Sequence, residues 1–341
     1  MKLICGAGNQ DLAAVEDLCA LYSLAGVHCI DVAADAAVAA AARRGMAWAE
    51  ERGAARPWLM LSLSDGDDPH FRKAQFDPLQ CPPDCPRPCQ RVCPALAIEP
   101  HQGGVIRERC YGCGRCLPAC PLGLIEEQQV VLSADAVPAL LKSVQPDAVE
   151  LHTQAGRQLA FAQRLAQVQA SGVALKRLAV SCGLERGAQA RTTASTSAPA
   201  QTLANGAANL TARDLASELW QRFSLVRQAG FQPLWQLDGR PMSGDVGVGT
   251  ARSAVQLLEA IRAWAPPGPL QLAGGTNANT AALLTAESGV AGVAFGGMAR
   301  SLLQPLLVEA EARGTSLRAC PALQSQALAL AQALIAPWLN R

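Results

Sequence analysis

Eight of the 13 cysteines in this 341-residue chain fall between positions 81 and 120, and they constrain the fold more than any other feature. The second half of this stretch has the spacing C-x2-C-x2-C-x3-C-P, the motif of bacterial ferredoxins. The first half has the same ending, but its first two gaps are each one residue longer. In ferredoxins the fourth cysteine of each motif binds the other cluster, so the spacing predicts two cross-ligated [4Fe–4S] clusters. One would be held by Cys81, Cys85, Cys89 and Cys120, and the other by Cys110, Cys113, Cys116 and Cys93.

Other uses of these cysteines explain the pattern less well. Neither a pair of zinc ribbons nor a disulfide knot accounts for two C-x3-C-P endings. A radical-type cluster with an open iron requires C-x3-C-x2-C, and the first motif misses this spacing by one residue. The other five cysteines are scattered, and we expect them to be core residues: Cys5, Cys19, Cys29, Cys182 and Cys320.

Two arginines, Arg87 and Arg115, lie inside the cluster loops. A cation beside a cluster favours its reduced, more negative form and therefore raises its reduction potential. We hypothesise that these clusters are less strongly reducing than those of an acidic ferredoxin. The alternative is that both side chains are simply solvated.

Charge and hydropathy argue against a nucleic-acid-binding protein and against a membrane-spanning one. The chain has 29 Lys and Arg against 28 Asp and Glu, a net charge of +1, so we expect no nucleic-acid partner. No window reaches the roughly 18 uninterrupted apolar residues of a transmembrane segment, and the N-terminus does not resemble a signal peptide. We therefore expect a cytoplasmic protein, in which disulfides rarely persist.

Outside the cysteine-rich stretch, short apolar runs alternate with Ala- and Leu-rich helical patterns. Eight such units in order predict an α/β fold of the TIM-like (β/α)8 barrel type. Alternation does not by itself require closure, so an open doubly wound sheet is the alternative. The predicted strands are Leu3–Ala7, Val27–Ala33, Trp58–Ser64, Ala148–Thr153, Arg177–Cys182, Pro233–Asp238, Leu270–Ala273 and Gly292–Phe295. The predicted helices cover 11–25, 35–52, 134–144, 156–170, 211–229, 250–264, 278–288 and 299–313, with a final helix over 321–336.

The cysteine-rich stretch interrupts the third of these units. We therefore divide the chain into a barrel formed by residues 1–76 and 127–341 and an inserted ferredoxin-like domain of residues 77–126. Loops that follow strands lie at the carboxyl face of a barrel, where active sites are built, so the clusters would lie beside the barrel mouth. A second long loop, 185–209, is rich in Ala, Ser, Thr and Gly, and we expect it to be flexible.

Glycine pairs follow the seventh and eighth predicted strands. The first loop contains Gly274, Gly275 and Thr276, and the second contains Gly296 and Gly297. Barrels often bind phosphate between these loops through backbone N–H groups and a helix N-terminus. A phosphorylated ligand is therefore a candidate, and FMN is the obvious one beside iron–sulfur clusters. The alternative is that these glycines only form tight turns.

Polar residues within apolar strands mark a further candidate site. Glu150 and His152 share one face of the fourth strand, and Gln236 and Asp238 share one face of the sixth. If the apolar faces pack against helices, these side chains face the barrel axis, where burial requires partners or a ligand. A self-satisfied polar core and a substrate site both fit. The candidate lining residues are Glu150, His152, Gln236, Asp238, Arg240 and Gln271.

The cysteine-rich stretch and its flanks resemble the cyanobacterial light-dependent period (LdpA) family. The resemblance is carried by residues 77–94 (DPLQCPPDCPRPCQRVCP) and 109–125 (RCYGCGRCLPACPLGLI), and by the flanks 25–33 (AGVHCIDVA) and 149–153 (VELHT). The Pro- and Arg-rich first motif is the discriminating part. The resemblance implies an iron–sulfur protein that reports cellular redox state to the circadian clock, adjusts its period with light, and associates with clock and input-kinase proteins.

Two functions follow from these observations. The first is a redox sensor, in which electron flow through quinone or ferredoxin changes the cluster state and the altered domain contacts partners. The second is a flavin-dependent oxidoreductase, in which two [4Fe–4S] clusters pass electrons to a cofactor in the barrel. The glycine pairs favour the second function, whereas the family resemblance favours the first.

Overall fold

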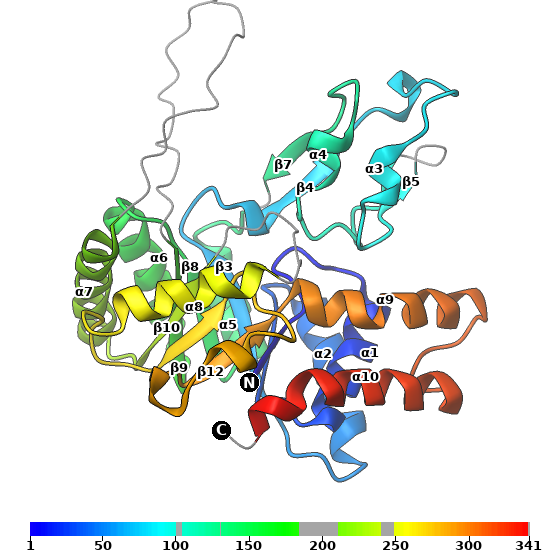
Figure 1. Ribbon diagram of the computed structural model, residues 1–341. Coiled ribbons are helices and arrows are strands. Elements are labelled where there is room, and N and C mark those ends of the chain that lie inside the picture. The colour runs from blue at the N-terminus through cyan, green and yellow to red at the C-terminus, as the bar shows by residue number, and fades with distance from the viewer. Residues whose placement is uncertain (100–103, 130, 184–210, 240–248, 340–341) are drawn as a thin grey trace, which may run out of the picture.

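Eight parallel strands close into a barrel within the residues that this computed structural model describes, which are 1–99, 104–129, 131–183, 211–239 and 249–339 (Figure 1). The strands follow one another in chain order, and the first pairs with the last, Leu3 lying opposite Phe295. This closure confirms the predicted TIM-like barrel and excludes the open sheet. The strands are β1 (Lys2–Ile4), β2 (Cys29–Ala33), β3 (Trp58–Ser64), β8 (Ala148–His152), β9 (Arg177–Cys182), β10 (Pro233–Asp238), β11 (Leu270–Ala273) and β12 (Gly292–Phe295).

Helices on the outside of the barrel connect most of the successive strands (Figure 1). The connecting helices are α1 (Leu12–Ala25), α2 (Ala36–Glu50), α5 (Ala136–Val144), α6 (Gln158–Ala170), α7 (Ala212–Gln228) and α8 (Thr250–Ile261). After the last strand come α9 (Gly297–Ala312) and α10 (Pro321–Leu339). The final helix α10 packs against α1 and α9 and covers that side of the barrel.

The prediction of a helix over 278–288 is wrong. This segment forms two 3₁₀ turns instead, η3 (Ala281–Leu283) and η4 (Ala286–Ser288). Short polar side chains bond to its backbone: the Asn279 N–H donates to Asn277 Oδ1 at 2.9 Å, and the Thr285 N–H donates to Ser288 Oγ at 2.9 Å. Such bonds compete with the helical hydrogen-bond ladder, which explains why no continuous helix forms here.

Side chains alternate between the two faces of each barrel strand, as an extended backbone requires. The outward set is apolar and packs under the helices, as Leu61, Val149 and Leu237 do in the main core. The inward set is apolar at the amino ends of the strands and polar at the carboxyl ends. The inward apolar residues form a separate small cluster of Cys29, Met60, Ala148 and Ala179. The barrel is therefore filled at one end and polar at the other.

The cysteine-rich segment leaves the barrel after β3 and returns before α5 (Figure 1). Its ends are joined by an antiparallel pair, β4 (Arg72–Gln75) with β7 (Glu126–Gln129). Between them lie α3 (Pro88–Arg91), β5 (Ile98–Glu99), β6 (Gly104–Val105) and α4 (Cys116–Ala119). Cysteines and apolar side chains form a core of this segment that is separate from the barrel core. The limits 77 and 126 of an inserted domain stay a prediction.

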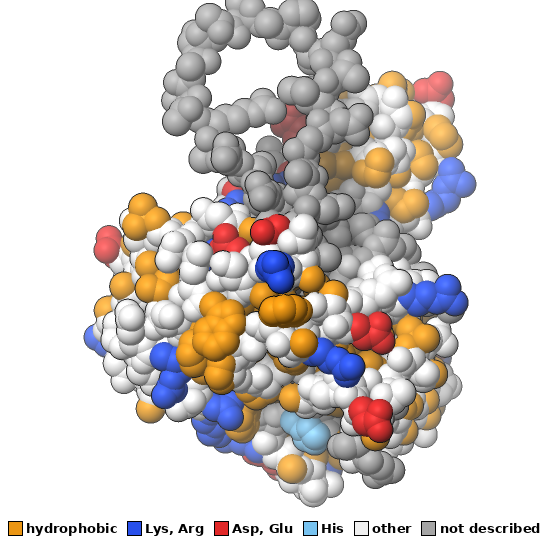
Figure 2. All heavy atoms as spheres, turned by 60° about the vertical axis from the view of Figure 1, so that its left-hand side comes forward, with side chains coloured by type: hydrophobic (Ala, Val, Ile, Leu, Met, Phe, Trp, Pro, Cys, Tyr) orange, Lys and Arg blue, Asp and Glu red, His pale blue; other side chains and the backbone are white. Residues whose placement is uncertain are grey.

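The loop predicted over 185–209 lies outside the described residues. Figure 2 shows the face that carries α7 and α8, where hydrophobic side chains occur in small groups between polar ones. Trp220 and Trp264 are about half exposed, and the Trp220 indole donates to the Trp264 carbonyl at 2.9 Å. Among the described residues, no helix has the length and apolar character needed to cross a membrane.

Candidate redox site at the barrel mouth

The polar residues predicted on β8 and β10 line one pocket at the carboxyl ends of the strands. Glu150, His152 and Gln236 are buried, and Asp238 is partly exposed toward the pocket. Gln271 is also buried, but its side chain does not line this pocket. The sixth candidate of this set, Arg240, lies outside the described residues.

A buried lysine compensates the carboxylates inside the barrel. The Lys2 ammonium bonds Glu150 and lies 3.5 Å from Asp31 Oδ2, and all three side chains are almost fully buried. Asp31 also accepts the Ser62 hydroxyl at 2.7 Å. Burial raises the pKa of Asp31 to about 7. For Glu150 burial acts in the same direction, but the Lys2 and His152 charges outweigh it and hold its pKa well below its usual range.

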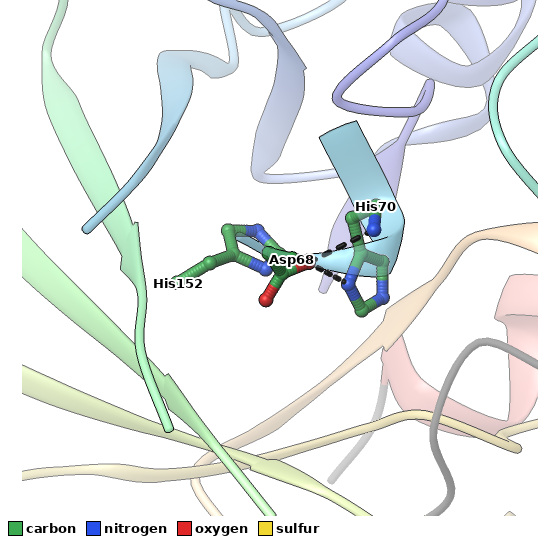
Figure 3. A group of neighbouring side chains, drawn as sticks. All are labelled: Asp68, His70 and His152. Atoms are coloured by element: carbon green, nitrogen blue, oxygen red, sulfur yellow. Dashed lines mark hydrogen bonds and ion pairs between the residues drawn. The ribbon is translucent and has the colours of Figure 1, made fainter. Parts of the chain in front are cut away.

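Two histidines meet at the rim of this network. His152 Nε2 lies 3.1 Å from Glu150 Oε1. His70 Nδ1 lies 2.7 Å from Asp68 Oδ1 (Figure 3). The two imidazole ring centres are 4.8 Å apart. Burial alone would lower the pKa of His152, but the Glu150 carboxylate outweighs burial and raises it to about 9. Each imidazole therefore has its own carboxylate.

Asp238 lies beside the same histidines. Burial raises the pKa of Asp238 to about 6, although the His70 charge and a hydrogen bond from Ser181 favour its ionised form. The Ser181 hydroxyl also accepts the Gln236 side-chain N–H at 3.3 Å, and Gln236 bonds Glu150 in turn. The inward-facing polar groups thus form one connected network with acid, base and amide members.

The two glycine loops reach the same pocket from β11 and β12. Gly274, Gly275, Thr276, Gly296 and Gly297 all line it. Gly274 and Gly275 have φ values of 53° and 94°, in the left-handed region that favours glycine. The Thr276 hydroxyl is engaged with the Ala294 carbonyl at 2.6 Å. These loops therefore line the pocket mainly with backbone.

Helix α9 begins at Gly297, directly after β12, so its N-terminus lies at the pocket. Its N-cap is Gly296, no side chain caps it, and its first turn has no acidic residue. Arg300 in this turn is 7% exposed, lines the pocket and donates to the Ile4 carbonyl at 2.8 Å. A helix N-terminus and a buried guanidinium together make this corner electropositive.

The eight clustered cysteines form no disulfide with any described residue, and they interact in two groups of four. Burial raises the pKa of Cys89, and the charges that add to this effect come from Cys120, Cys81 and Cys85. Burial raises the pKa of Cys116 to about 12, with further contributions from three other thiols, Cys113, Cys110 and Cys93. Each group thus contains the final cysteine of the other motif.

Backbone N–H groups surround these sulfurs. The Ala74 N–H donates to Cys110 Sγ at 3.3 Å, and the Ala97 N–H donates to Cys93 Sγ at 3.2 Å. For Cys120, burial raises the pKa, but hydrogen bonds from the following backbone, led by Leu124, outweigh it and lower the pKa. Thiols with N–H donors aimed at sulfur are the environment in which iron–sulfur clusters are bound, because such bonds stabilise thiolate charge.

The pocket joins the two parts of the molecule. Its walls include Cys113 and Arg115 of the cysteine-rich segment as well as the barrel residues described above. Its empty volume, which includes space open to solvent, is about 1000 Å³. Tyr111 lies between Cys110 and Cys113 in the sequence, and its ring stacks on the Arg300 guanidinium of α9. A ligand in this pocket would therefore contact both a cluster-binding loop and the barrel mouth.

Several residues of this site were not predicted from the sequence. Lys2 was missed because the first strand was expected to begin at Leu3. Asp31 could have been predicted, because it is a charged residue within the apolar strand β2, just as Glu150 is within β8. Nothing in the sequence pointed to His70 or Arg300, since both reach the pocket only through the packing of distant segments.

Comparison with known proteins identifies the family. Residues 81–131 match the LdpA Fe-S cluster-binding domain, and residues 140–337 match the light dependent period A C-terminal domain. The chain is 44% identical over 346 residues to light dependent period A of Synechococcus elongatus, covering 98% of this chain and 90% of that protein. A solved type I 3-dehydroquinate dehydratase from Clostridium difficile is similar at 9% identity, with 97% and 91% of the chains covered and a TM-score of 0.38. The chain therefore belongs to the light-dependent period A family and carries its iron–sulfur cluster-binding domain.

Proposed function

We propose that this protein is an iron–sulfur redox sensor that relays cellular redox state, and with it light, to the circadian clock and modulates its period. The observation that carries the proposal is the position of Cys113, which belongs to one group of four thiols and also lines the barrel pocket. A bound [4Fe–4S] cluster supplies one-electron oxidation and reduction. Family membership supports the connection with light and period.

Side chains connect the cluster-binding loop to the barrel. Tyr111 stacks on Arg300, whose guanidinium carbon lies 4.0 Å from the ring centre, and Arg300 donates to the Ile4 carbonyl. A change in charge on the thiols beside Tyr111 would therefore act on a buried cation at the barrel mouth. Electrostatic interactions are stronger in such a site than in water, because the local dielectric constant is lower.

The proposed cofactors are two [4Fe–4S] clusters, held by the two cross-ligating sets of four cysteines. The proposed partners are circadian clock and input-kinase proteins, with quinone or ferredoxin as the electron donor. The two groups of interacting thiols and the N–H donors to Cys110 and Cys93 support this assignment.

Serine variants test the cross-ligation. Anaerobically purified wild-type protein should contain about eight iron atoms per chain, and Cys116→Ser should retain about four. Cys93→Ser should remove the same electron paramagnetic resonance signal as Cys116→Ser, whereas Cys89→Ser should remove the other signal. Cys320→Ser is the control and should keep all the iron. If Cys93→Ser instead matches Cys89→Ser, each motif holds its own cluster and the cross-ligation is wrong.

A binding assay tests the sensor function. Oxidised and dithionite-reduced protein would be immobilised anaerobically and exposed to purified clock proteins and input kinases. We expect association to differ several-fold between the two states of wild-type protein, and this difference to disappear in Cys116→Ser. Equal association of both wild-type states would contradict the sensor proposal.

The shared pocket favours a second candidate function, a flavin-dependent oxidoreductase. Five residues of the predicted phosphate-binding loops line a pocket that is also lined by Cys113 of the cysteine-rich segment. The electropositive corner formed by the α9 N-terminus and Arg300 suits a phosphate group of FMN. Gly275→Ala would place a Cβ 2.9 Å from the Thr250 carbonyl, in a backbone conformation that disfavours alanine.

Flavin analysis separates the two functions. For the oxidoreductase we expect one FMN per chain after anaerobic purification, and a large loss of FMN in Gly275→Ala with the iron content unchanged. Gly289→Ala is the control, because Gly289 also has a positive φ but an added Cβ there meets nothing within 4 Å. If the wild-type protein binds no added FMN, the oxidoreductase function is excluded and the sensor function remains.

A further inference from the structure

We propose that Asp68, His70 and His152 bind one divalent transition-metal ion in the wall of the barrel pocket. Neither the cluster-binding cysteines nor the glycine loops take part in this site, so it is independent of the proposed sensor function. Among the described residues, these three ligating side chains offer donor atoms that all lie within 4.8 Å of one another (Figure 3).

The three side chains come from two segments that are far apart in the sequence. Asp68 caps the short turn η1 (Pro69–Phe71) after β3, where it accepts the His70 backbone N–H at 2.8 Å. His152 is the last residue of β8, which pairs with β3, so both segments end at the same edge of the barrel. One ligand thus lies at the end of a barrel strand, and the other two lie in the turn that follows the adjacent strand.

The distances require only small side-chain rotations. Zinc–nitrogen and zinc–oxygen bonds of roughly 2.0–2.2 Å place ligand atoms about 3–3.5 Å apart. Asp68 Oδ1 and His70 Nδ1 are already 2.7 Å apart, and the donor atoms of all three side chains lie within 4.8 Å of one another. A metal ion would take the place of the hydrogen-bonded proton between His70 and Asp68.

The surroundings orient the ligands as they do in metal sites. His152 Nε2 is engaged with Glu150 Oε1 at 3.1 Å, which leaves Nδ1 as the ligand atom. Glu150 is itself held by Lys2 and Gln236. A histidine whose second nitrogen donates to a fixed carboxylate is the usual arrangement around a protein-bound metal, because it sets the ring orientation and raises ligand basicity. Phe71 packs edge-on against His152, with ring centres 5.2 Å apart.

The charge balance also favours a cation. Asp68 and Glu150 each contact one of the two imidazoles, so a divalent ion bound between the imidazoles would lie beside carboxylates that compensate its charge. Two imidazoles and one carboxylate bind ions such as Zn²⁺, Fe²⁺ and Mn²⁺ and leave coordination positions open. Because His70 and His152 both line the pocket, these open positions would face it. They suit a small molecule with an anionic oxygen donor, such as a carboxylate or a phosphate ester.

Zinc binding to the cluster-loaded full chain tests the site. Anaerobically purified protein would be freed of loosely bound metal with a chelator, dialysed against Zn²⁺ and analysed for zinc and iron. We expect one zinc per chain in addition to the full iron content. Affinity should fall more than 100-fold in His70→Ala and His152→Gln, and about 10- to 100-fold in Glu150→Gln. This last variant keeps all three ligands but removes the carboxylate that contacts both His152 and Lys2, so its folding is checked by circular dichroism.

Two measurements keep this test specific. His28→Ala should bind zinc as wild-type protein does, because His28 is exposed and bonds the N-terminal amine away from the pocket. X-ray absorption at the zinc edge should show nitrogen and oxygen ligands without sulfur. Zinc with sulfur ligands, no zinc in the wild-type protein, or equal zinc in His70→Ala and wild-type protein with matching circular dichroism would each overturn the proposal.

Discussion

The guanidinium carbon of Arg300 lies 4.0 Å from the centre of the Tyr111 ring, and this contact joins the barrel to the cluster-binding loop. Arg300 belongs to the first turn of α9, whereas Tyr111 lies between two of the predicted cluster ligands. Arg300 also donates to the Ile4 carbonyl at 2.8 Å, at the end of β1. A single buried side chain of α9 thus contacts both the first strand of the barrel and the inserted segment.

Replacing this arginine should loosen the inserted segment. Arg300→Met removes a desolvated cation–π contact and a buried hydrogen bond, so we expect the free energy of unfolding to fall by about 2–3 kcal/mol. Thermal unfolding of the anaerobically purified protein measures the effect. Arg52→Met is the matched control, because Arg52 stacks on Trp48 at 3.9 Å on the exposed surface and should cost under about 1 kcal/mol. Equal losses in the two variants would contradict this role of Arg300.

Removing the buried lysine should strongly destabilise the barrel. Lys2→Met leaves Glu150 and Asp31 without their cation, and breaking a buried ion pair from one side costs about 3–5 kcal/mol. Lys176→Met breaks an exposed pair with Asp147 and should cost at most about 1 kcal/mol. Adding Glu150→Gln to Lys2→Met should restore part of the stability. A double variant less stable than Lys2→Met, in chemical denaturation, would show that the charge of Glu150 is not the cause.

The buried carboxyl of Asp31 should make stability depend on pH. Its pKa is raised from 3.8 to about 7, so between these values the folded state binds more protons than the unfolded chain. The free energy of unfolding therefore falls as pH rises through this window, by at most about 4 kcal/mol from this group. Asp31→Asn should remove that part of the fall.

A second variant separates Asp31 from the other titrating groups. Ser62→Ala removes the hydrogen bond that favours the ionised form of Asp31, so the fall in stability should move to higher pH. Melting temperatures measured from pH 5 to pH 8 for the three proteins give the comparison. Parallel curves for wild type and Asp31→Asn would mean that Asp31 does not titrate in this range.

The cation beside Cys113 should raise the reduction potential of the neighbouring cluster. Arg115 lines the pocket with Cys113, and its charge favours the ionised Cys113 thiol. Arg115→Gln keeps the backbone N–H but removes this charge, so the midpoint potential should become more negative, by tens of millivolts on the scale where about 59 mV is a tenfold change. Arg91→Gln is the control, because Arg91 is exposed and bonds the Pro86 carbonyl. A potentiometric titration in which Arg115→Gln matches wild type would reject the charge effect.

Local sequence patterns were sufficient to predict much of the fold. The eight barrel strands could be predicted because each is a short apolar run bounded by helical segments, and the period-two alternation assigned Glu150 and His152 to the inward face of β8. The segment 278–288 could not be predicted correctly, since its Ala- and Leu-rich composition favours a helix while its Asn, Thr and Ser side chains bond the backbone. The strands β4 and β7 were missed because their residues are mostly polar and pair only across the inserted segment.

The sequence by itself determined the eight thiol positions, the order of the barrel strands and the family, because all three are written in spacing and composition along the chain. Only the tertiary structure brought Lys2 to Glu150, Arg300 to Tyr111, and Asp68 and His70 to His152. The longest of these contacts joins Tyr111 to Arg300, about 190 positions apart, and barrel closure and the return of the inserted segment to the barrel mouth set such distances. Such pairings leave no periodic signal, since one residue from each segment suffices to form them.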